Sequence, residues 1–267
     1  MASGPFAYVR SMPINAGPLE AVPLEAVSIK AVVWDIDDTI FDYAHADTEG
    51  IRAHLVAEDL LARYGTAAEA LTLWKQTTER HWARFGAGEV DFETQRRDRV
   101  RDFVGAALDD TEADAWFARY RTHYEAAWTL FPDTVPTLDA LADRYRHAVL
   151  SNSAHAVQDH KLRTLGVRDR FEALLCAADL GVSKPAAEAF HAVCEELGLA
   201  PAEIAYVGDQ PEIDARGARD AGLLGIWLDR NGSAQEGPSG IHRIAALTEL
   251  PALLRADTRF GAPSTFG

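Results

Sequence analysis

Three aspartates crowd into four residues directly after a short apolar run. Asp35, Asp37 and Asp38 follow Ala31–Trp34, and Thr39 adds a hydroxyl group to the same turn. Carboxylates at this spacing repel one another, so a fold that keeps them together needs a cation or a protonated member. Taken by itself, an Asp-rich turn is more often a helix cap or a solvated loop. The turn indicates a functional site only if polar residues from other segments lie next to it in the folded chain.

Three later segments contribute further polar side chains, two of them directly after apolar runs. They are Ser151-Asn152 after Ala148–Leu150, Lys184-Pro185 at the start of a helical segment, and Gly208-Asp209 with Asp214 after Ile204–Val207. Each alone has an ordinary interpretation as a helix cap, a turn or a solvated lysine. Because ligands of open α/β sheets bind outside the carboxyl ends of the strands, the order and the strand-end positions together predict one site.

This ordered set resembles the four motifs of the haloacid dehalogenase-like hydrolase superfamily. The matching positions are Asp35-x-Asp37-x-Thr39, Ser151-Asn152, Lys184-Pro185 and Gly208-Asp209 with Asp214. The resemblance spans about residues 31 to 230, and the first motif is its most specific part. It implies phosphoryl transfer, with Asp35 as the nucleophile that forms an aspartyl phosphate and Asp37 as the general acid and then base.

The resemblance also implies a cofactor, Mg²⁺, which prefers oxygen ligands and bridges to phosphate. The implied metal ligands are Asp35, Asp37 through its backbone carbonyl, Asp209 and Asp214. Lys184 is implied as a catalytic residue that offsets charge on the transferring phosphoryl oxygens. The implied substrate-binding residues are Thr39, Ser151, Asn152 and Lys184.

The residue at position 37 distinguishes branches of this family. Members that cleave carbon–halogen or carbon–phosphorus bonds lack an acid two residues after the nucleophile, because their chemistry needs no proton donor there. Asp37 therefore favours hydrolysis of a small-molecule phosphomonoester by a phosphatase. Two alternatives stay open: a phosphomutase acting on a sugar phosphate, and a non-catalytic protein of the same fold that binds a phosphate ligand. Gln210-Pro211 is an unusual continuation of the fourth motif and leaves its local shape open.

The elements that must position these residues are short apolar runs, and the segments between these runs have apolar residues at helical spacing. The predicted strands are Ala31–Trp34, Ala148–Leu150, Ala173–Cys176, Ile204–Val207 and Gly225–Leu228. Their lack of polar alternation is typical of strands that are buried on both faces. The pattern predicts an α/β fold, a doubly wound, Rossmann-like parallel sheet with helices on both sides.

A stretch of roughly 85 residues without a convincing strand interrupts this rhythm, far beyond a normal connection. One helix is predicted from Ile51 through Tyr64, ended by Gly65, and three more near 67–85, 91–107 and 111–127. The expected organisation is an N-terminal extension (1–30), an α/β core (31–43 and 131–256), an inserted helical-bundle cap (44–130) and a C-terminal tail (257–267).

The cap is expected to close over the site and to select the substrate, as lids generally do. Its candidate contact residues are Trp74, Trp82, Phe85, Trp116, Tyr120, Tyr124 and Trp128, and the basic Lys75, Arg80, His81 and Arg84. Aromatic side chains at helical spacing more often form a bundle core, and helix-face arginines are usually solvated. His45 and His155 adjoin motif residues and are expected to have surface or hydrogen-bonding roles.

Composition narrows the functional classes. The 267 residues include 41 acidic and 26 basic side chains, for a net charge of −15, which argues against nucleic acid as a partner. The two cysteines are too few for a disulfide scaffold and favour a reducing, cytoplasmic compartment. No apolar run reaches the roughly 18 residues of a membrane span. The expected partner is a small phosphate ester, bound by a monomer or a homodimer.

Overall fold

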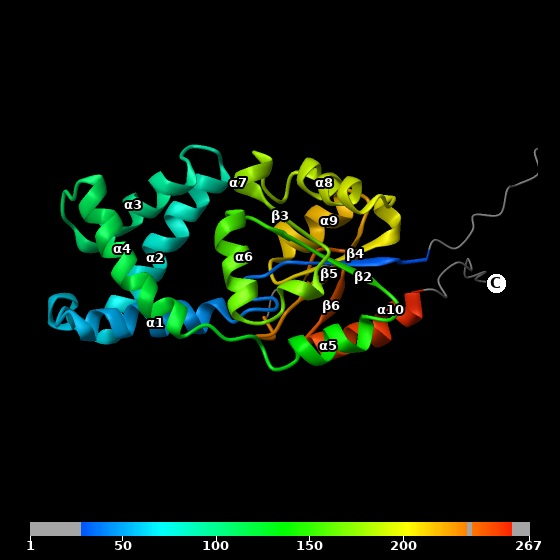
Figure 1. The fold of residues 1–267 in the computed structure, drawn as a ribbon, viewed down its shortest axis with the longest axis horizontal. Coiled ribbons are helices and arrows are strands. Elements are labelled where there is room, and N and C mark those ends of the chain that lie inside the picture. The colour runs from blue at the N-terminus through cyan, green and yellow to red at the C-terminus, as the bar shows by residue number, and fades with distance from the viewer. Residues whose placement is uncertain (1–27, 234–236, 258–267) are drawn as a thin grey trace, which may run out of the picture.

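The core of the protein is a six-stranded parallel sheet with the strand order β3-β2-β1-β4-β5-β6. The computed structural model describes residues 28–233 and 237–257, so the expected extension and tail lie almost entirely outside the described residues. The doubly wound parallel sheet predicted from the sequence is confirmed (Figure 1). Within the described ranges, no helix is both long enough and apolar enough to cross a bilayer.

All five predicted strands are present, with bounds that differ by two residues or fewer. The observed strands are β1 (Ala31–Trp34), β2 (Arg146–Ser151), β3 (Ala173–Cys176), β4 (Ile204–Gly208), β5 (Leu224–Leu228) and β6 (His242–Ile244). The sequence analysis missed β6, because this edge strand has only three residues and Ile244 is its single fully buried position. An apolar run cannot be recognised in so short a segment.

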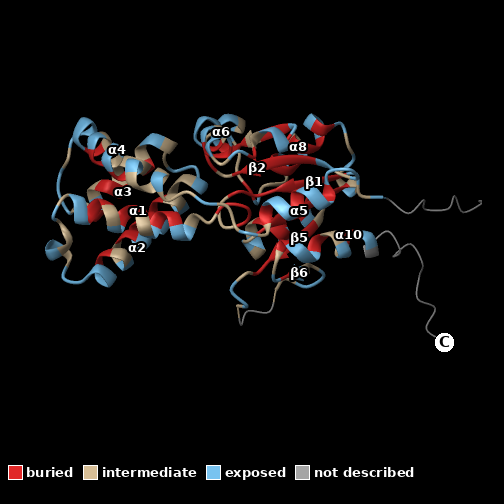
Figure 2. Cartoon of the chain, turned by 60° about the horizontal axis from the view of Figure 1, so that its bottom comes forward, coloured by how far each residue is buried: buried red, intermediate tan, exposed pale blue. Residues whose placement is uncertain are grey.

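Helices cover both faces of the sheet (Figures 1 and 2). Val32 and Trp34 of β1 belong to an apolar cluster that includes side chains of α5 (Thr134–Leu141), α6 (His155–Thr164) and α10 (Leu250–Asp257). The alternate residues of β1 belong to a second cluster, with α8 (Ala187–Leu197) and α9 (Gly217–Asp220). Strands buried from both sides explain the continuous apolar runs of the sequence. The remaining short core elements are α7 (Ala177–Leu180), a π-helical turn (Pro211–Arg216) and 3-10 turns at Arg168–Arg170, Pro201–Glu203 and Leu247–Glu249.

Five α-helices lie between β1 and β2 in the chain, and the first four of them form a bundle beside the sheet (Figure 1). These four are α1 (Tyr43–Ala57), α2 (Ala67–Gly86), α3 (Phe92–Val104) and α4 (Asp110–Ala126). The bundle has a separate apolar cluster, which includes Ile51, Trp74, Phe103 and Trp116. Capping boxes begin α2 and α4, and Gly105 ends α3 in the left-handed conformation.

One predicted helix is wrong in its extent. The segment predicted as a single helix up to Tyr64 is divided, since α1 ends at Ala57 and a separate 3-10 turn covers Leu61–Tyr64. Asp59 interrupts the helix with a φ of +54°, a conformation outside the right-handed helical region. Gly65, with a φ of +83°, ends the second piece as predicted.

His54 gives the bundle a predicted dependence on pH. Its ring is fully buried against Trp116 with centroids 4.5 Å apart, and neither ring nitrogen has a hydrogen-bond partner in the described chain. Burial lowers the pKa of His54 to about 4. Since the unfolded histidine titrates near pH 6.5, the unfolded state binds more protons between these values, and stability falls as pH drops from about 6.5 towards 4.

The expected contribution of His54 to this loss is up to about 3 kcal/mol. Urea unfolding at a series of pH values should therefore show a weaker dependence on pH in His54→Leu than in the unaltered protein. His147 is a second buried histidine whose pKa burial lowers to about 4, so part of the dependence should persist in the variant. Identical pH profiles for the two proteins would contradict the assignment to His54.

Candidate functional site

The four segments singled out in the sequence meet at the carboxyl edge of the sheet. Asp35 follows β1, the central strand between β2 and β4, and its backbone N–H donates to the carbonyl of Val207 at 2.9 Å. Ser151 is the last residue of β2, and Asp209 follows β4. Parallel pairing brings these three strand ends together although the residues lie far apart in the chain.

Lys184 is the centre of the polar contacts in this group. Its Nζ donates to Asp35 Oδ1 at 2.7 Å, to Asp214 Oδ1 at 2.7 Å and to the Tyr206 hydroxyl at 2.6 Å. Lys184, Asp35 and Asp214 are all buried. The two carboxylates raise the pKa of Lys184 well above its usual value, against the opposing effect of burial, so the ammonium group stays charged.

Asn152 holds the backbone of Lys184. Its side-chain oxygen accepts from the Lys184 N–H at 2.8 Å, and its amide nitrogen donates to the Lys184 carbonyl at 2.9 Å. The Lys184–Pro185 peptide bond is cis. The amide group of Asn152 therefore fixes the loop that carries Lys184. The expected contact of Asn152 with substrate stays a prediction.

Three carboxylates form a cluster suited to a divalent cation. One oxygen from each of Asp35, Asp209 and Asp214 lies within 4.8 Å of the others. Burial raises the pKa of Asp35 to about 7, opposed by Lys184 and reinforced by Asp214, and burial with Asp214 raises the pKa of Asp209 to about 9. Asp209 Oδ1 is buried without a hydrogen-bond partner. A hard cation with oxygen ligands, such as Mg²⁺, would relieve this repulsion and satisfy that oxygen, so the residues fit the ion.

The loop after β4 is shaped around Asp214. A Cβ atom at Gly208 would lie 2.3 Å from Asp214 Cγ, so glycine alone permits this approach. The Gln210 N–H donates to Asp214 Oδ2 at 3.0 Å. The following segment, Pro211–Arg216, forms a π-helical turn, which is the local shape that Gln210-Pro211 had left open in the sequence.

Asp37 points to a different set of partners. Its carboxylate accepts from Gln158 Nε2 at 2.7 Å and from Lys161 Nζ, both on α6. Lys161 is buried, and its ammonium group lies 4.2 Å from the centre of the Phe41 ring. Sequence reasoning missed Gln158 and Lys161, because a lysine in a helix is normally read as solvated.

The remaining motif hydroxyl groups lie beside these contacts. Thr39 is fully buried, and its Oγ1 makes a long 3.4 Å hydrogen bond to Asp35 Oδ2. Ser151 Oγ accepts from Gln158 Nε2 at 3.0 Å.

Tyr206, also missed in the sequence, donates from its hydroxyl to the Leu150 carbonyl at 2.9 Å and accepts from Lys184. Asp38 accepts from the Ala44 N–H, and burial raises its pKa to about 6.

A cavity of about 390 Å³ lies between the bundle and the core. Asp37 and Lys161 line it from the core side, and aromatic side chains line much of the rest. Among the aromatic candidates of the sequence analysis, those that line it are Trp82, Tyr120, Tyr124 and Trp128.

Other candidates in the bundle have structural contacts instead. Trp74 and Trp116 belong to the bundle core, and Phe85 lines a separate hollow. His81 and Arg80 pair with Asp102, Arg84 pairs with Asp98, and Lys75 pairs with Glu79 on the exposed face of α2. His45 and His155 are exposed and do not line the cavity.

Curated relatives with similar sequences are named as phosphatases. The chain is 25% identical over 234 residues to N-acylneuraminate-9-phosphatase of Homo sapiens, covering 85% of this chain and 94% of that protein. It is 28% identical over 220 residues to phosphoserine phosphatase of Thermus thermophilus, covering 73% of this chain and 87% of that protein.

Solved structures share the fold. The putative HAD-hydrolase YfnB of Bacillus subtilis, solved with magnesium, has a TM-score of 0.74 at 20% identity and covers 85% of this chain and 99% of that one. A 2-haloacid dehalogenase of Pseudomonas syringae has a TM-score of 0.63 at 26% identity, covering 85% and 98%. Residues 29–222 match the family model described as haloacid dehalogenase-like hydrolase. The chain therefore belongs to the haloacid dehalogenase-like hydrolase family.

Proposed function

We propose that this protein is a Mg²⁺-dependent phosphatase that hydrolyses a small-molecule phosphomonoester through an aspartyl phosphate on Asp35. The observation that carries the proposal is the environment of Asp35, a buried carboxylate at the end of β1 that contacts Lys184 and adjoins Asp209 and Asp214. A nucleophile, a fixed ammonium group and a carboxylate cluster suited to a cation are the parts that phosphoryl transfer requires.

In this mechanism the two oxygens of Asp35 have separate tasks. Oδ1 accepts from Lys184, and Oδ2, which has the long contact with Thr39, attacks phosphorus. The bond between phosphorus and the ester oxygen breaks, and the leaving oxygen takes a proton from Asp37. Water then attacks phosphorus in the aspartyl phosphate, and Asp37 receives a proton of that water. The bond between phosphorus and Asp35 Oδ2 breaks, which releases inorganic phosphate and restores the Asp35 carboxylate.

The other motif residues act on charge and position. Lys184 neutralises part of the charge of the phosphoryl oxygens, while Asn152 fixes the backbone of Lys184 and Ser151 adds a hydroxyl group nearby. When bound by Asp35, Asp209, Asp214 and the backbone carbonyl of Asp37, Mg²⁺ would supply positive charge to the phosphoryl group.

Dehalogenases share the fold, so the fold does not distinguish dehalogenation from phosphate hydrolysis. The curated relatives named as phosphatases support phosphate hydrolysis. Within the family resemblance, the acid at position 37 is the feature that distinguishes the two chemistries. We further propose that residues 44–130 act as the cap over a core of 31–43 and 131–256. We also propose that the reaction takes place in the cytoplasm, where Cys176 and Cys194 remain free thiols.

Asp37→Asn provides a prediction specific to the acid role. The rate should fall by about 10²- to 10⁴-fold for alkyl phosphates, whose leaving groups need a proton, and much less for para-nitrophenyl phosphate. Initial rates with a series of aryl and alkyl esters would measure this difference. Equal losses for good and poor leaving groups would remove Asp37 from the acid role.

The test of the proposed function is phosphate release from a broad panel of phosphomonoesters, with Mg²⁺ or with excess chelator. Release with many turnovers that stops in chelator is expected. An isomeric phosphate with little free phosphate would instead identify a phosphomutase. Saturable binding of phosphate esters with neither product would identify a non-catalytic binding protein, and both of these outcomes would overturn the proposal.

A further inference from the structure

Arg99 of α3 is a buried arginine without an acidic partner. It is 5% exposed, and within the described chain it has no hydrogen bond or ion pair. Its guanidinium carbon lies 4.9 Å from the centre of the Trp74 ring and 5.1 Å from that of Phe117. An arginine can rest against aromatic rings, but its N–H groups still require acceptors, and a buried charge without a partner is costly.

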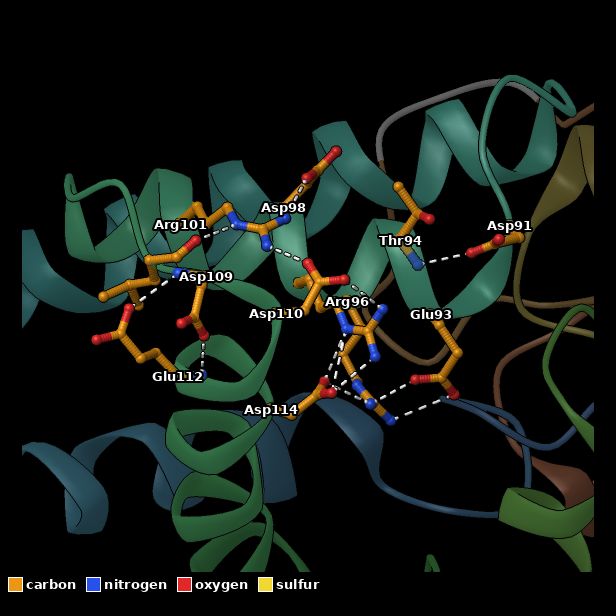
Figure 3. Close-up of polar contacts among 12 residues, drawn as sticks. Asp91, Glu93, Thr94, Arg96, Asp98, Arg101, Asp109, Asp110, Glu112 and Asp114 are labelled. Atoms are coloured by element: carbon orange, nitrogen blue, oxygen red, sulfur yellow. Dashed lines mark hydrogen bonds and ion pairs between the residues drawn. The ribbon is translucent and has the colours of Figure 1, made fainter.

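The neighbouring arginines of α3 are all paired. Arg96 and Arg97 both contact Asp114 of α4, at 2.9 and 2.7 Å, and Arg101 pairs with two further aspartates. Figure 3 shows this network on the side of α3 that meets the start of α4. Arg96 and Arg99 both line the cavity, but Arg96 is held by Glu93 and Asp114 of the protein, whereas Arg99 has no carboxylate partner within the described chain.

A second unsatisfied polar group lies one helical turn before Arg99. Gln95 is 1% exposed, lines the same cavity, and has a buried Oε1 without a hydrogen-bond partner. Asp47 is a nearby buried carboxylate, but its oxygens accept from Trp74 Nε1 at 2.9 Å and from the Tyr120 hydroxyl at 2.6 Å. No ion pair links it to Arg99, so the positive charge remains available to a ligand.

The cavity connects Arg99 with the proposed reaction centre. Asp37 and Lys161 line the same space as Arg99 and Gln95. Tyr43 lines the same cavity. A volume of about 390 Å³ with aromatic walls suits a small organic molecule.

We propose that Arg99 and Gln95 form a subsite for a carboxylate of the substrate, so that the substrate is a phosphomonoester that also carries a carboxylate group. A guanidinium group matches the geometry of a carboxylate, and one unpaired cation corresponds to one negative charge. Gln95 would contribute through its side-chain Nε2, which donates to a carboxylate oxygen, since Oε1 is itself an acceptor. The inference rests on the proposed phosphatase function, because Asp37, which lines the same cavity, defines where the phosphate ester lies.

The test compares esters with and without this carboxylate charge. Para-carboxyphenyl phosphate and its neutral carboxamide form one pair, and phosphoserine and phosphoethanolamine form an aliphatic pair. The unaltered protein should favour the carboxylate member by about 10- to 100-fold in kcat/KM, mainly through KM. Arg99→Met should reduce this ratio to near one, and Arg99→Lys should restore part of it.

Arg101→Met is the matched control, since Arg101 lies on the same helix, has its own ion pairs and does not line the cavity. It should keep the ratio of the unaltered protein. If Arg99→Met does not fold, Arg99→Lys and Gln95→Leu carry the test, each with a reduced ratio. Equal kcat/KM for both members of each pair in the unaltered protein would overturn the subsite, and so would a ratio unchanged in Arg99→Met.

Binding distinguishes failure of the subsite from failure of the proposed function. Calorimetry with Asp35→Asn and with Asp35→Asn/Arg99→Met measures the affinity of each pair without turnover. If no ester is hydrolysed but the carboxylate member binds more tightly in a manner that requires Arg99, the subsite stands and the phosphatase proposal fails. If phosphate is released without preference, the subsite fails. A bisphosphate preferred over the carboxylate ester would overturn the assignment to a carboxylate.

Discussion

Asp35→Asn should lower the rate of phosphate release by at least about 10³-fold, because an amide oxygen cannot form the aspartyl phosphate. The side chains have nearly the same shape, so the fold should be retained. The substitution also removes one of three mutually repelling carboxylates from the buried cluster. This relief offsets part of the stability that is lost with the contact between Asp35 and Lys184. Initial rates with the best ester of the panel, at saturating Mg²⁺, measure the effect.

Asp38→Asn is the matched control for this experiment. Asp38 lies in the same turn with a φ of +59°, which asparagine adopts readily, and the Oδ1 that accepts from the Ala44 N–H is retained. The rate of phosphate release by Asp38→Asn should stay within about threefold of that of the unaltered protein, a difference in activation free energy of less than about 1 kcal/mol. If Asp35→Asn stays within about tenfold of that control, Asp35 is not the nucleophile.

Lys184→Met should affect both stability and activity. Removing the ammonium group leaves Asp35 and Asp214 buried without their counterion, and breaking a buried pair in this way costs about 3–5 kcal/mol. The phosphoryl oxygens also lose a fixed positive charge, so turnover should fall by about 10²-fold or more. Urea unfolding and phosphate release measure the two effects separately.

The loss of stability should be larger in chelator than in Mg²⁺, since a cation bound by the same carboxylates would replace part of the missing charge. Lys30→Met serves as the control. Lys30 pairs with Glu203 at 2.5 Å on the surface, and its removal should cost about 0–1 kcal/mol. If Lys184→Met is no less stable than that control, the buried ion pairs do not hold the site together.

The sequence determined the sheet and the position of the site on it. Apolar runs without polar alternation predicted five of the six strands. Central parallel strands are buried on both faces, so each appears in the sequence as a continuous apolar run, whichever strand it pairs with. The aspartates after β1 and β4 predicted a carboxylate cluster at the carboxyl edge, since strand order brings those ends together. The same reasoning failed for β6, which is too short to form an apolar run.

The tertiary structure alone decided which partners the polar residues have. Lys161 lies 124 positions after Asp37, and no spacing rule joins them, because their contact depends on how α6 packs beside the β1 turn. Asn152 fixes Lys184, and Arg99 differs from its three neighbouring arginines in having no carboxylate partner within the described residues. Sequence specifies which groups are present, while packing over long separations decides which of them remain unpaired and available to a ligand.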